Sequence, residues 1–148
     1  MSQVSNTTET KVIVFQINDK EYVIPVSQVR SIEKMMPITR VPRTPHFVEG
    51  VINLRGVVTP IIDLRKRLGV EEAPYNDHTR IIIVHLEDKE VGLIVDSAND
   101  VLDLPAESIE PQPEVVGAQE EEYITGVAKL NKRLLVLMNL EKVLHSST

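Results

Sequence analysis

The side chains that could do chemistry in this 148-residue chain are few and poorly spaced for it. There is no cysteine, which excludes thiolate zinc sites, disulfides and cysteine nucleophiles. The four histidines do not form the paired spacing that a metal site on one helix or strand requires; they are His46, His78, His85 and His145. The sequence therefore predicts no metal site.

A serine nucleophile and a phosphate-binding loop are not predicted either. The chain lacks the G-x-S-x-G elbow that exposes a nucleophilic serine. Its six glycines are scattered and form neither G-x-x-x-x-G-K-[ST] nor G-x-G-x-x-G. We therefore expect no catalytic residues, no cofactor and no enzymatic activity.

Arg55 is the residue with the clearest binding chemistry. It stands at a predicted tight turn between two apolar strands, where Gly56 can adopt a positive φ. Arginine is frequent in binding hot spots because its guanidinium makes paired hydrogen bonds and stacks on other groups. The pattern allows two interpretations. Either Arg55, with Asn53 and the backbone near Gly50 and Gly56, anchors a partner, or this segment is simply the best-packed hairpin of its half.

The elements that must position these residues come from an internal duplication. Shifted by 69 positions, Ile13 to Ile32 aligns with Ile82 to Val101. Shifted by 76 positions, Gly50 to Leu68 aligns with Gly126 to Leu144, with six of nineteen residues identical. Two such matches in the same order predict two structurally related halves.

Each half is predicted to consist of short β-strands closed by a short helix. Apolar residues at i and i+4 predict helices from Leu64 to Leu68 and from Leu140 to Leu144. The segment after Pro25 is expected to begin as a helical turn. Short runs rich in β-branched residues predict strands at 12–17, 51–54, 57–62, 81–86, 127–130 and 134–140. Many short strands without a long helix favour an all-β fold of two small barrels.

Two of the predicted turns contain no glycine. They are Asn18-Asp19 in the first half and Glu87-Asp88 in the second. Since the commonest two-residue hairpin turns use glycine, we expect slightly longer loops at these places.

Composition and charge exclude several classes of partner. The net charge of −6, the absence of Trp and the presence of only three Tyr and two Phe argue against nucleic acid. No apolar run is long enough to span a membrane, and the polar N-terminus lacks a secretory pattern. We expect a cytoplasmic protein without membrane insertion.

The charge is divided unequally along the chain. Residues 34–69 carry seven basic and two acidic residues, whereas residues 70–125 carry two basic and fifteen acidic residues. Such polarity is compatible with charge-steered contacts between proteins and equally with two ordinary solvated faces.

Four segments resemble the CheW family of bacterial chemotaxis coupling proteins. The most specific is HFVEGVINLRGVVTPIIDLRKRLG at 46–69. The others are VIVFQINDKEYVIPVSQVRSIEK (12–34), RIIIVHLEDKEVGLIVDSANDVLDL (80–104) and RLLVLMNLEKVL (133–144). The resemblance covers residues 11–144, and the length of the chain favours the stand-alone form of the family.

The resemblance implies two intertwined SH3-like barrels of five strands each, in agreement with the duplication. We expect a disordered polar tail at 1–10, a single domain at 11–144 and a short tail at 145–148. Within the domain, the two subdomains are expected at roughly 13–68 and 82–144, with elements exchanged between them.

The resemblance also implies a non-enzymatic adaptor. Such a protein would join the regulatory domain of a CheA-type histidine kinase to the cytoplasmic hairpin tip of methyl-accepting chemotaxis receptors. It would be a monomer in isolation, would form rings with the kinase, and would be recruited to receptor arrays at the membrane. The alternative is a coupling protein of the same type in a pilus or developmental pathway.

The residues implied in binding follow from the family's motif. The receptor groove would include Ile32, Phe47, Gly50, Val51, Asn53, Leu54, Arg55 and Gly56. The kinase face would use Ile13, Val26 and Val29. Many family members carry glutamate where this chain has Ser31, so Glu33 would have to supply that carboxylate.

Overall fold

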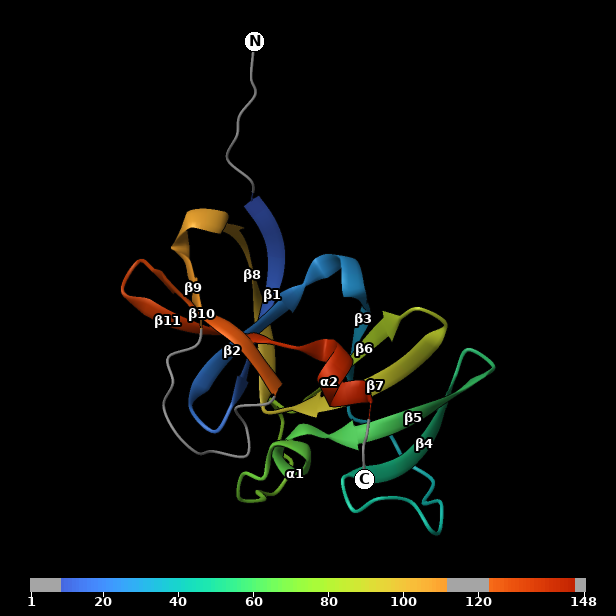
Figure 1. Ribbon diagram of the computed structural model, residues 1–148. Helices are drawn as coiled ribbons and strands as arrows, with labels where there is room; N and C mark the ends of the chain where they lie inside the picture. Colours follow the sequence, from blue (N-terminus) through green and yellow to red (C-terminus); the bar gives the residue numbers. More distant parts are fainter. Residues whose placement is uncertain (1–8, 112–122, 146–148) are drawn as a thin grey trace.

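The computed structural model describes residues 9–111 and 123–145, which form two β-sheets and two short helices (Figure 1). The six-stranded sheet has the order β8-β1-β2-β11-β10-β9. Its strands are β1 (Glu9–Ile17), β2 (Lys20–Pro25), β8 (Ser97–Pro105), β9 (Ile109–Pro111), β10 (Ile124–Leu130) and β11 (Arg133–Met138). The five-stranded sheet has the order β3-β6-β7-β5-β4. Its strands are β3 (Val29–Lys34), β4 (Val48–Leu54), β5 (Val57–Asp63), β6 (Arg80–Leu86) and β7 (Lys89–Val95).

The two halves of the chain exchange strands, as the intertwined fold predicts. β1 and β2 belong to the first half but pair with β8 and β11 of the second. β6 and β7 belong to the second half but pair with β3 and β5 of the first. Each barrel therefore contains strands from both halves.

The helices form where the sequence predicts them. α1 (Leu64–Leu68) begins after Asp63, whose carboxylate accepts hydrogen bonds from the backbone N–H groups of Arg65 and Lys66. α2 (Leu140–Leu144) begins after Asn139, whose side chain accepts from the N–H of Lys142. The expected helical turn after Pro25 is a 3-10 turn, η1 (Val26–Gln28).

Both barrels close where a chain segment pairs with the strand that follows it, β4 in the first half and β10 in the second. In the five-stranded barrel, Thr39 and Val51 exchange two backbone hydrogen bonds of 2.9 Å. In the six-stranded barrel, β9 pairs with β10. The closing strand of this barrel is bent at a second 3-10 turn, η2 (Ala106–Ser108), and therefore counts as two strands where a single one was expected.

The core is divided into three clusters because most strands are buried on both faces. One cluster fills the six-stranded barrel and includes Val12, Val14 and Leu135. A second fills the five-stranded barrel and includes Ile61 and Ile81. The largest contains residues of both sheets and both helices, so it joins the barrels; it includes Phe15, Tyr22, Leu64, Ile82, Leu93, Met138 and Val143. Burial on both faces explains why these strands are continuous apolar runs in the sequence.

The prediction of longer loops at the turns without glycine is wrong. Ile17 pairs with Lys20, and Leu86 pairs with Lys89, so both turns have two residues. Asn18, Asp19 and Glu87 adopt φ values of 53°, 70° and 58°. The right-handed twist of the strands favours turns with positive φ, and Asn and Asp tolerate that conformation better than most residues. At Glu87, the stabilisation gained from strand pairing outweighs the cost of its positive φ.

The predicted tail at 1–10 is wrong at its last two residues, Glu9 and Thr10, which belong to β1. β1 begins at Glu9, because Glu9 and Thr10 pair with Pro105 and Leu104 of β8. The remainder of the tail, the acidic stretch 112–122 and residues 146–148 lie outside the described residues.

Candidate functional site

The tip of the β4–β5 hairpin holds the residues with the clearest binding chemistry. Leu54 pairs with Val57, which leaves a two-residue turn. Arg55 and Gly56 have φ values of 54° and 86°. Asn53 supports the turn, since its side-chain Oδ1 accepts a hydrogen bond of 2.9 Å from the N–H of Gly56. The turn presents the Arg55 side chain to solvent with 70% of its surface exposed.

Arg55 has one ionic neighbour among the described residues. Its Nη2 lies 3.6 Å from Oε2 of Glu33 in β3. An exposed pair at this distance contributes at most about 1 kcal/mol to folding. The pair therefore orients the guanidinium more than it stabilises the barrel.

Of Ser31 and Glu33, only Glu33 reaches Arg55. The Ser31 Oγ atom is buried and has no hydrogen-bond partner in the described part of the chain. Glu33, two residues along β3, reaches the guanidinium of Arg55 instead. The structure thus brings together Arg55 and the residue considered as the substitute for the usual family glutamate.

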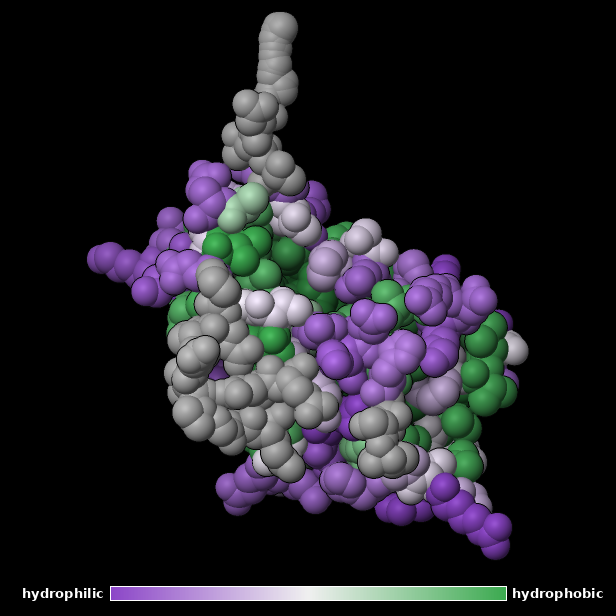
Figure 2. Space-filling model, viewed as in Figure 1, coloured by the Kyte–Doolittle hydropathy of each residue, from purple (hydrophilic) through white to green (hydrophobic). Residues whose placement is uncertain are grey.

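Exposed apolar residues lie close to Arg55 and Glu33 in the sequence. Val57 and Val58 are 50% and 64% exposed, and Ile32, the neighbour of Glu33, is 39% exposed. Figure 2 shows apolar surface at the right-hand edge of the molecule, over the β4–β5 hairpin of Figure 1. We call the residues Ile32, Glu33, Leu54, Arg55, Gly56, Val57 and Val58 the tip surface.

The matching hairpin of the second half has a different surface. Arg133 stands at the position that corresponds to Val57. Its guanidinium donates hydrogen bonds of 3.1 and 2.9 Å to the carboxylate of Glu21 in β2, and it also contacts Asp100. Asn131 stands at the position that corresponds to Arg55, so an exposed arginine at the tip of the hairpin is a property of the first half and not of the repeated fold.

The other residues predicted for the receptor groove lie away from the tip. Phe47 is 7% exposed and belongs to the core that joins the barrels. It precedes β4, so about 20 Å of extended strand separates it from the turn. Gly50 is buried, and a Cβ atom there would lie 2.1 Å from the carbonyl oxygen of Thr39. Val51 makes the backbone bonds that close the barrel.

The three residues predicted for the kinase face lie where the first barrel joins the second. Ile13 is buried in β1 and pairs with Ile24 of β2 and Val101 of β8. Val26 and Val29 are half-buried, in η1 and at the start of β3. η1 contacts both β1 and β6. Ile13 thus has no free side-chain surface, whereas its pairing partner Val101 is 52% exposed.

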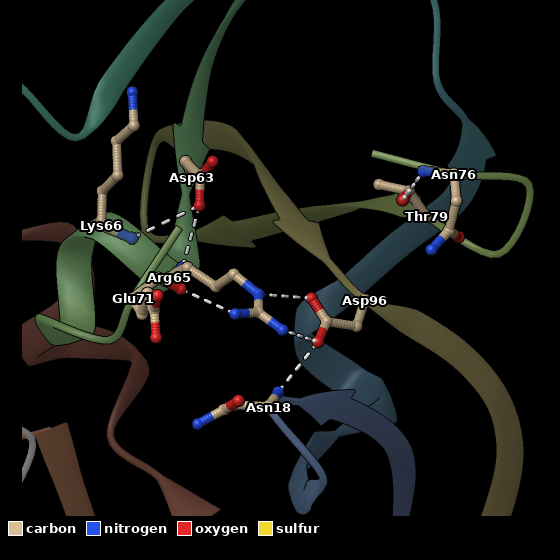
Figure 3. A network of polar contacts seen from close by, with 8 residues as sticks. All are labelled: Asn18, Asp63, Arg65, Lys66, Glu71, Asn76, Thr79 and Asp96. Atoms are coloured by element: carbon tan, nitrogen blue, oxygen red, sulfur yellow. Dashed lines mark hydrogen bonds and ion pairs between the residues drawn. The ribbon is translucent and has the colours of Figure 1, made fainter. Parts of the chain in front are cut away.

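A polar network that sequence reasoning missed ties the barrels together (Figure 3). Arg65 in α1 donates from Nε and Nη2 to the two carboxylate oxygens of Asp96, at 2.9 and 2.7 Å. The backbone N–H of Asn18 donates to the same carboxylate at 2.8 Å. Asp96 lies between β7 and β8, and Asn18 lies in the β1–β2 turn, so the network spans both barrels.

The ionisation of this network follows from its contacts. The hydrogen bond to Asp96 and the attraction of nearby carboxylates raise the pKa of Arg65 against the opposing effect of burial. Burial alone would raise the pKa of Asp96, but the hydrogen bonds from Arg65 and Asn18 lower it overall. The pair is therefore fully ionised at neutral pH.

Arg67 occupies an unusual position between the two halves. Its guanidinium carbon lies 4.2 Å from the ring centroid of Phe47 and 5.0 Å from that of Tyr123. Phe47 and Tyr123 correspond in the 76-residue shift, so Arg67 contacts equivalent rings of both halves. It also donates to the C-terminal carbonyls of α2, with the Val143 oxygen at 3.0 Å. The shift of 76 was the sequence signal that could have identified the aromatic pair.

The described residues offer neither a metal site nor a membrane-spanning helix. They contain no group of three or more His, Asp or Glu side chains placed to hold a metal ion. None of their helices combines the length and apolar character needed to cross a bilayer.

Comparison with known proteins gives a consistent result. A profile of the CheW-like domain matches residues 11–148. The chain is 50% identical to the chemotaxis protein CheW of Bacillus subtilis (strain 168) over 137 residues, which cover 93% of this chain and 88% of that protein. It is 39% identical to the chemotaxis protein CheW of Klebsiella aerogenes over 95% of this chain and 84% of that protein.

The fold is equally similar to a solved structure. The crystal structure of the scaffolding protein TtCheW from Thermoanaerobacter tengcongensis superposes with a TM-score of 0.87, at 34% identity and 95% coverage of both chains. A more distant relative, the protein FrzA of Myxococcus xanthus, is 28% identical over 94% of this chain and 88% of that protein. From the profile match, the identities and the shared SH3-like architecture it follows that the chain belongs to the CheW family of chemotaxis proteins.

Proposed function

We propose that this protein is a non-enzymatic adaptor that couples methyl-accepting chemotaxis receptors to a CheA-type histidine kinase. Its membership of the CheW family supports this function, and so does the similarity to a protein described as a scaffold. The observation that carries the proposal is the tip surface, where an exposed arginine is held by Glu33 beside unburied valines. A helical hairpin needs such an apolar surface with a few polar contacts.

The receptor would bind through the tip surface. Ile32, Val57 and Val58 would bury their exposed side chains against the apolar face of a receptor helix. Arg55 would hydrogen-bond to polar groups of the receptor, with Glu33 fixing its orientation. Phe47, Gly50 and Val51 would support the groove by holding β4 in place and not by touching the receptor.

The kinase would bind near η1, on the side of the molecule where Val26, Val29 and Val101 lie. Val26 and Val29 are half-buried, and Val101 adds an exposed apolar side chain beside β1. Ile13 would act by positioning Val101 across the β1–β8 pair.

An adaptor of this kind needs only modest affinities. Contacts in the micromolar range, about −8 kcal/mol, suffice when many copies are held in one array in the cytoplasm. Signal transfer requires that the receptor state bias the position of the bound kinase by roughly 1–3 kcal/mol. No covalent chemistry in the adaptor is required.

The test is reconstitution with receptor-containing membranes and a CheA-type kinase, measured by co-sedimentation. Wild type is expected to bring the kinase to the membranes. Arg55→Glu is expected to retain the kinase but lose the receptor, while Lys129→Glu, an exposed lysine of β10, behaves as wild type. If wild type binds neither partner, the adaptor function is wrong. If Arg55→Glu binds both partners normally, the tip surface is not the receptor contact.

A further inference from the structure

A basic hollow lies beside the loop that connects β3 and β4, away from the tip surface. One part, of about 500 Å³, is lined by the loop residues 40–46 together with Val48, Glu49 and Lys66. An adjoining part, of about 520 Å³, shares Pro45, His46 and Lys66 and extends to Arg67 and Tyr123. We call the two parts together the basic hollow. Figure 2 shows hydrophilic side chains at the lower right of the molecule, around the loop before β4 in Figure 1.

Some of the basic side chains in the basic hollow have no ionic partner within the described part of the chain. Its single acidic residue, Glu49, is bound by Lys66 at 2.7 Å. Arg67 is held by aromatic rings and by the carbonyls of α2. Arg40 and Arg43 are exposed, and neither forms an ion pair or a hydrogen bond with any described residue. Two guanidinium groups are therefore available to an anionic partner.

The loop holds these arginines in a fixed conformation. Pro42 and Pro45 restrict the backbone on both sides of Arg43, and the Thr44 hydroxyl donates to the carbonyl of Val41 at 3.2 Å. Arg43 has a φ of 66°, in the left-handed region that is unfavourable for a residue with a side chain. A non-glycine residue in that conformation often marks a place where function, not stability, selects the residue.

The repeated fold does not require basic residues here. In the 76-residue shift, the positions that match 43–46 are Gln119, Glu120, Glu121 and Glu122. Arg43 thus corresponds to an uncharged glutamine, and the three glutamates correspond to Thr44, Pro45 and His46. The basic character of the loop is specific to the first half.

We propose that the basic hollow binds an acidic segment of a protein partner, a peptide in which several Asp or Glu side chains reach Arg40 and Arg43. Arginine forms paired hydrogen bonds with carboxylates, and the rigid loop lowers the entropy cost of forming them. Val41, Pro42, Pro45 and Val48 supply apolar contacts for the peptide between the charges. A nucleic acid fits less well, because Phe47 and Tyr123 are buried and cannot stack on bases.

The proposal is tested on the isolated chain, so its outcome is independent of receptor and kinase binding. A short fluorescein-labelled peptide of alternating glutamate and glycine is titrated with protein, and its fluorescence anisotropy is measured at low and at moderate salt. Binding is expected to weaken with salt. The same peptide with glutamine in place of glutamate is expected not to bind.

The deciding variant is Arg40→Glu/Arg43→Glu, and its control is Lys129→Glu/Lys132→Glu. Both change the net charge equally, but the control lysines lie in the β10–β11 hairpin, exposed and outside the basic hollow. The first variant is expected to lower the affinity about tenfold and the control less than about twofold. Equal losses in the two variants would show that only the net charge matters, and the proposal would be wrong.

Two further measurements make the result decisive. Arg43→Gly removes the side chain and relieves the left-handed strain, so peptide binding is expected to fall while the melting temperature stays the same or rises. Peptide binding by Arg43→Gly at the wild-type affinity would remove Arg43 from the site. Tripolyphosphate serves as the competing anion. If it binds the hollow and excess glutamate peptide does not displace it, the site is one for phosphate and the acidic peptide is excluded.

Discussion

At the scale of single residues, the Arg55–Glu33 ion pair can be removed without disturbing the fold. Their ion pair is largely exposed, so its removal costs little stability. The guanidinium projects from a turn whose backbone is held by Asn53 and not by Arg55 itself. A loss of function at Arg55 can therefore be interpreted as the loss of a contact.

We predict that Arg55→Glu changes the free energy of unfolding by less than about 1 kcal/mol and abolishes receptor binding. The charge swap Arg55→Glu/Glu33→Arg distinguishes the two roles of the pair. If the ion pair itself is what the receptor needs, the swap restores binding. If Arg55 contacts the receptor directly, as proposed here, the swap remains defective. Urea unfolding and receptor co-sedimentation measure the two effects.

Arg67 differs from Arg55, because its contacts with the described residues are with buried rings and with backbone carbonyls of the fold. It stacks between Phe47 and Tyr123 and donates to the last carbonyls of α2. Stacked cations and helix C-terminal caps each contribute roughly 0.5–2 kcal/mol.

We predict that Arg67→Met lowers the free energy of unfolding by about 2–3 kcal/mol, since it removes both kinds of contact. Arg67→Lys keeps the charge but not the planar fork and is expected to fall between Met and wild type. Arg40→Met, at an exposed arginine without a described partner, is the control and is expected to change little. Equal stability of the Met and wild-type proteins in urea would contradict the role given to Arg67.

At the scale of elements, the closure of each barrel depends on a close approach of two backbones. In both halves β4 or β10 has a bulge beside a glycine, Gly50 or Gly126. A Cβ atom at Gly50 would lie 2.1 Å from the Thr39 oxygen, and one at Gly126 would lie 2.6 Å from the Glu110 oxygen. Gly50 also has a φ of 146°, which Gly126 does not share. The duplicated glycines are thus explained by the closing strand that passes over them.

We predict that Gly50→Ala destabilises the protein by about 3 kcal/mol or more, and Gly126→Ala by less. The clash at Gly50 is closer and is added to an unfavourable backbone conformation. Gly56→Asn is the control, because open space surrounds Gly56 and Asn tolerates positive φ; its cost is expected to be below about 1 kcal/mol. Thermal unfolding of the three variants ranks them, and a Gly50→Ala protein as stable as Gly56→Asn would contradict the argument.

At the scale of the whole molecule, two kinds of contact hold the barrels in one orientation. The largest apolar cluster joins them, and the Arg65–Asp96 network connects α1, the end of β7 and the β1–β2 turn. An adaptor that transmits a receptor state to a kinase must keep its two binding surfaces in a fixed relation. The network contributes to that rigidity.

We predict that Asp96→Asn lowers the free energy of unfolding at pH 7 by about 1–2 kcal/mol, an amount reduced by partial exposure of the carboxylate. The pKa of Asp96 is lowered in the folded protein, so its contribution is present above the unfolded value and is lost as the pH falls below about 4. The difference between wild type and Asp96→Asn should therefore shrink in acid. Urea unfolding at pH 7 and at about pH 3 measures it, and a difference that grows in acid would contradict this assignment.

The duplication, the all-β class and the positions of both short helices could be predicted from the sequence. Each depends on local patterns: β-branched runs, apolar residues four apart, and capping residues such as Asp63 before a helix. The family could also be inferred from sequence, because the segment 46–69 combines the hairpin with the following helix in one uninterrupted motif. The length of the Glu87-Asp88 turn could not be inferred, since the positive φ of Glu87 is imposed by strand twist and not by a preference of that residue.

Which of the predicted binding residues are exposed together depends on the three-dimensional fold. Arg55 and Ile32 are exposed near the tip, whereas Phe47, in the same motif, is buried about 20 Å along the strand. Likewise Arg67 meets Tyr123 and Arg65 meets Asp96 only because the two halves exchange strands. Arg55 meets Glu33 because the two edges of the five-stranded sheet come together when the barrel closes. Contacts between residues far apart in the chain depend on register and on barrel closure, which no local pattern encodes.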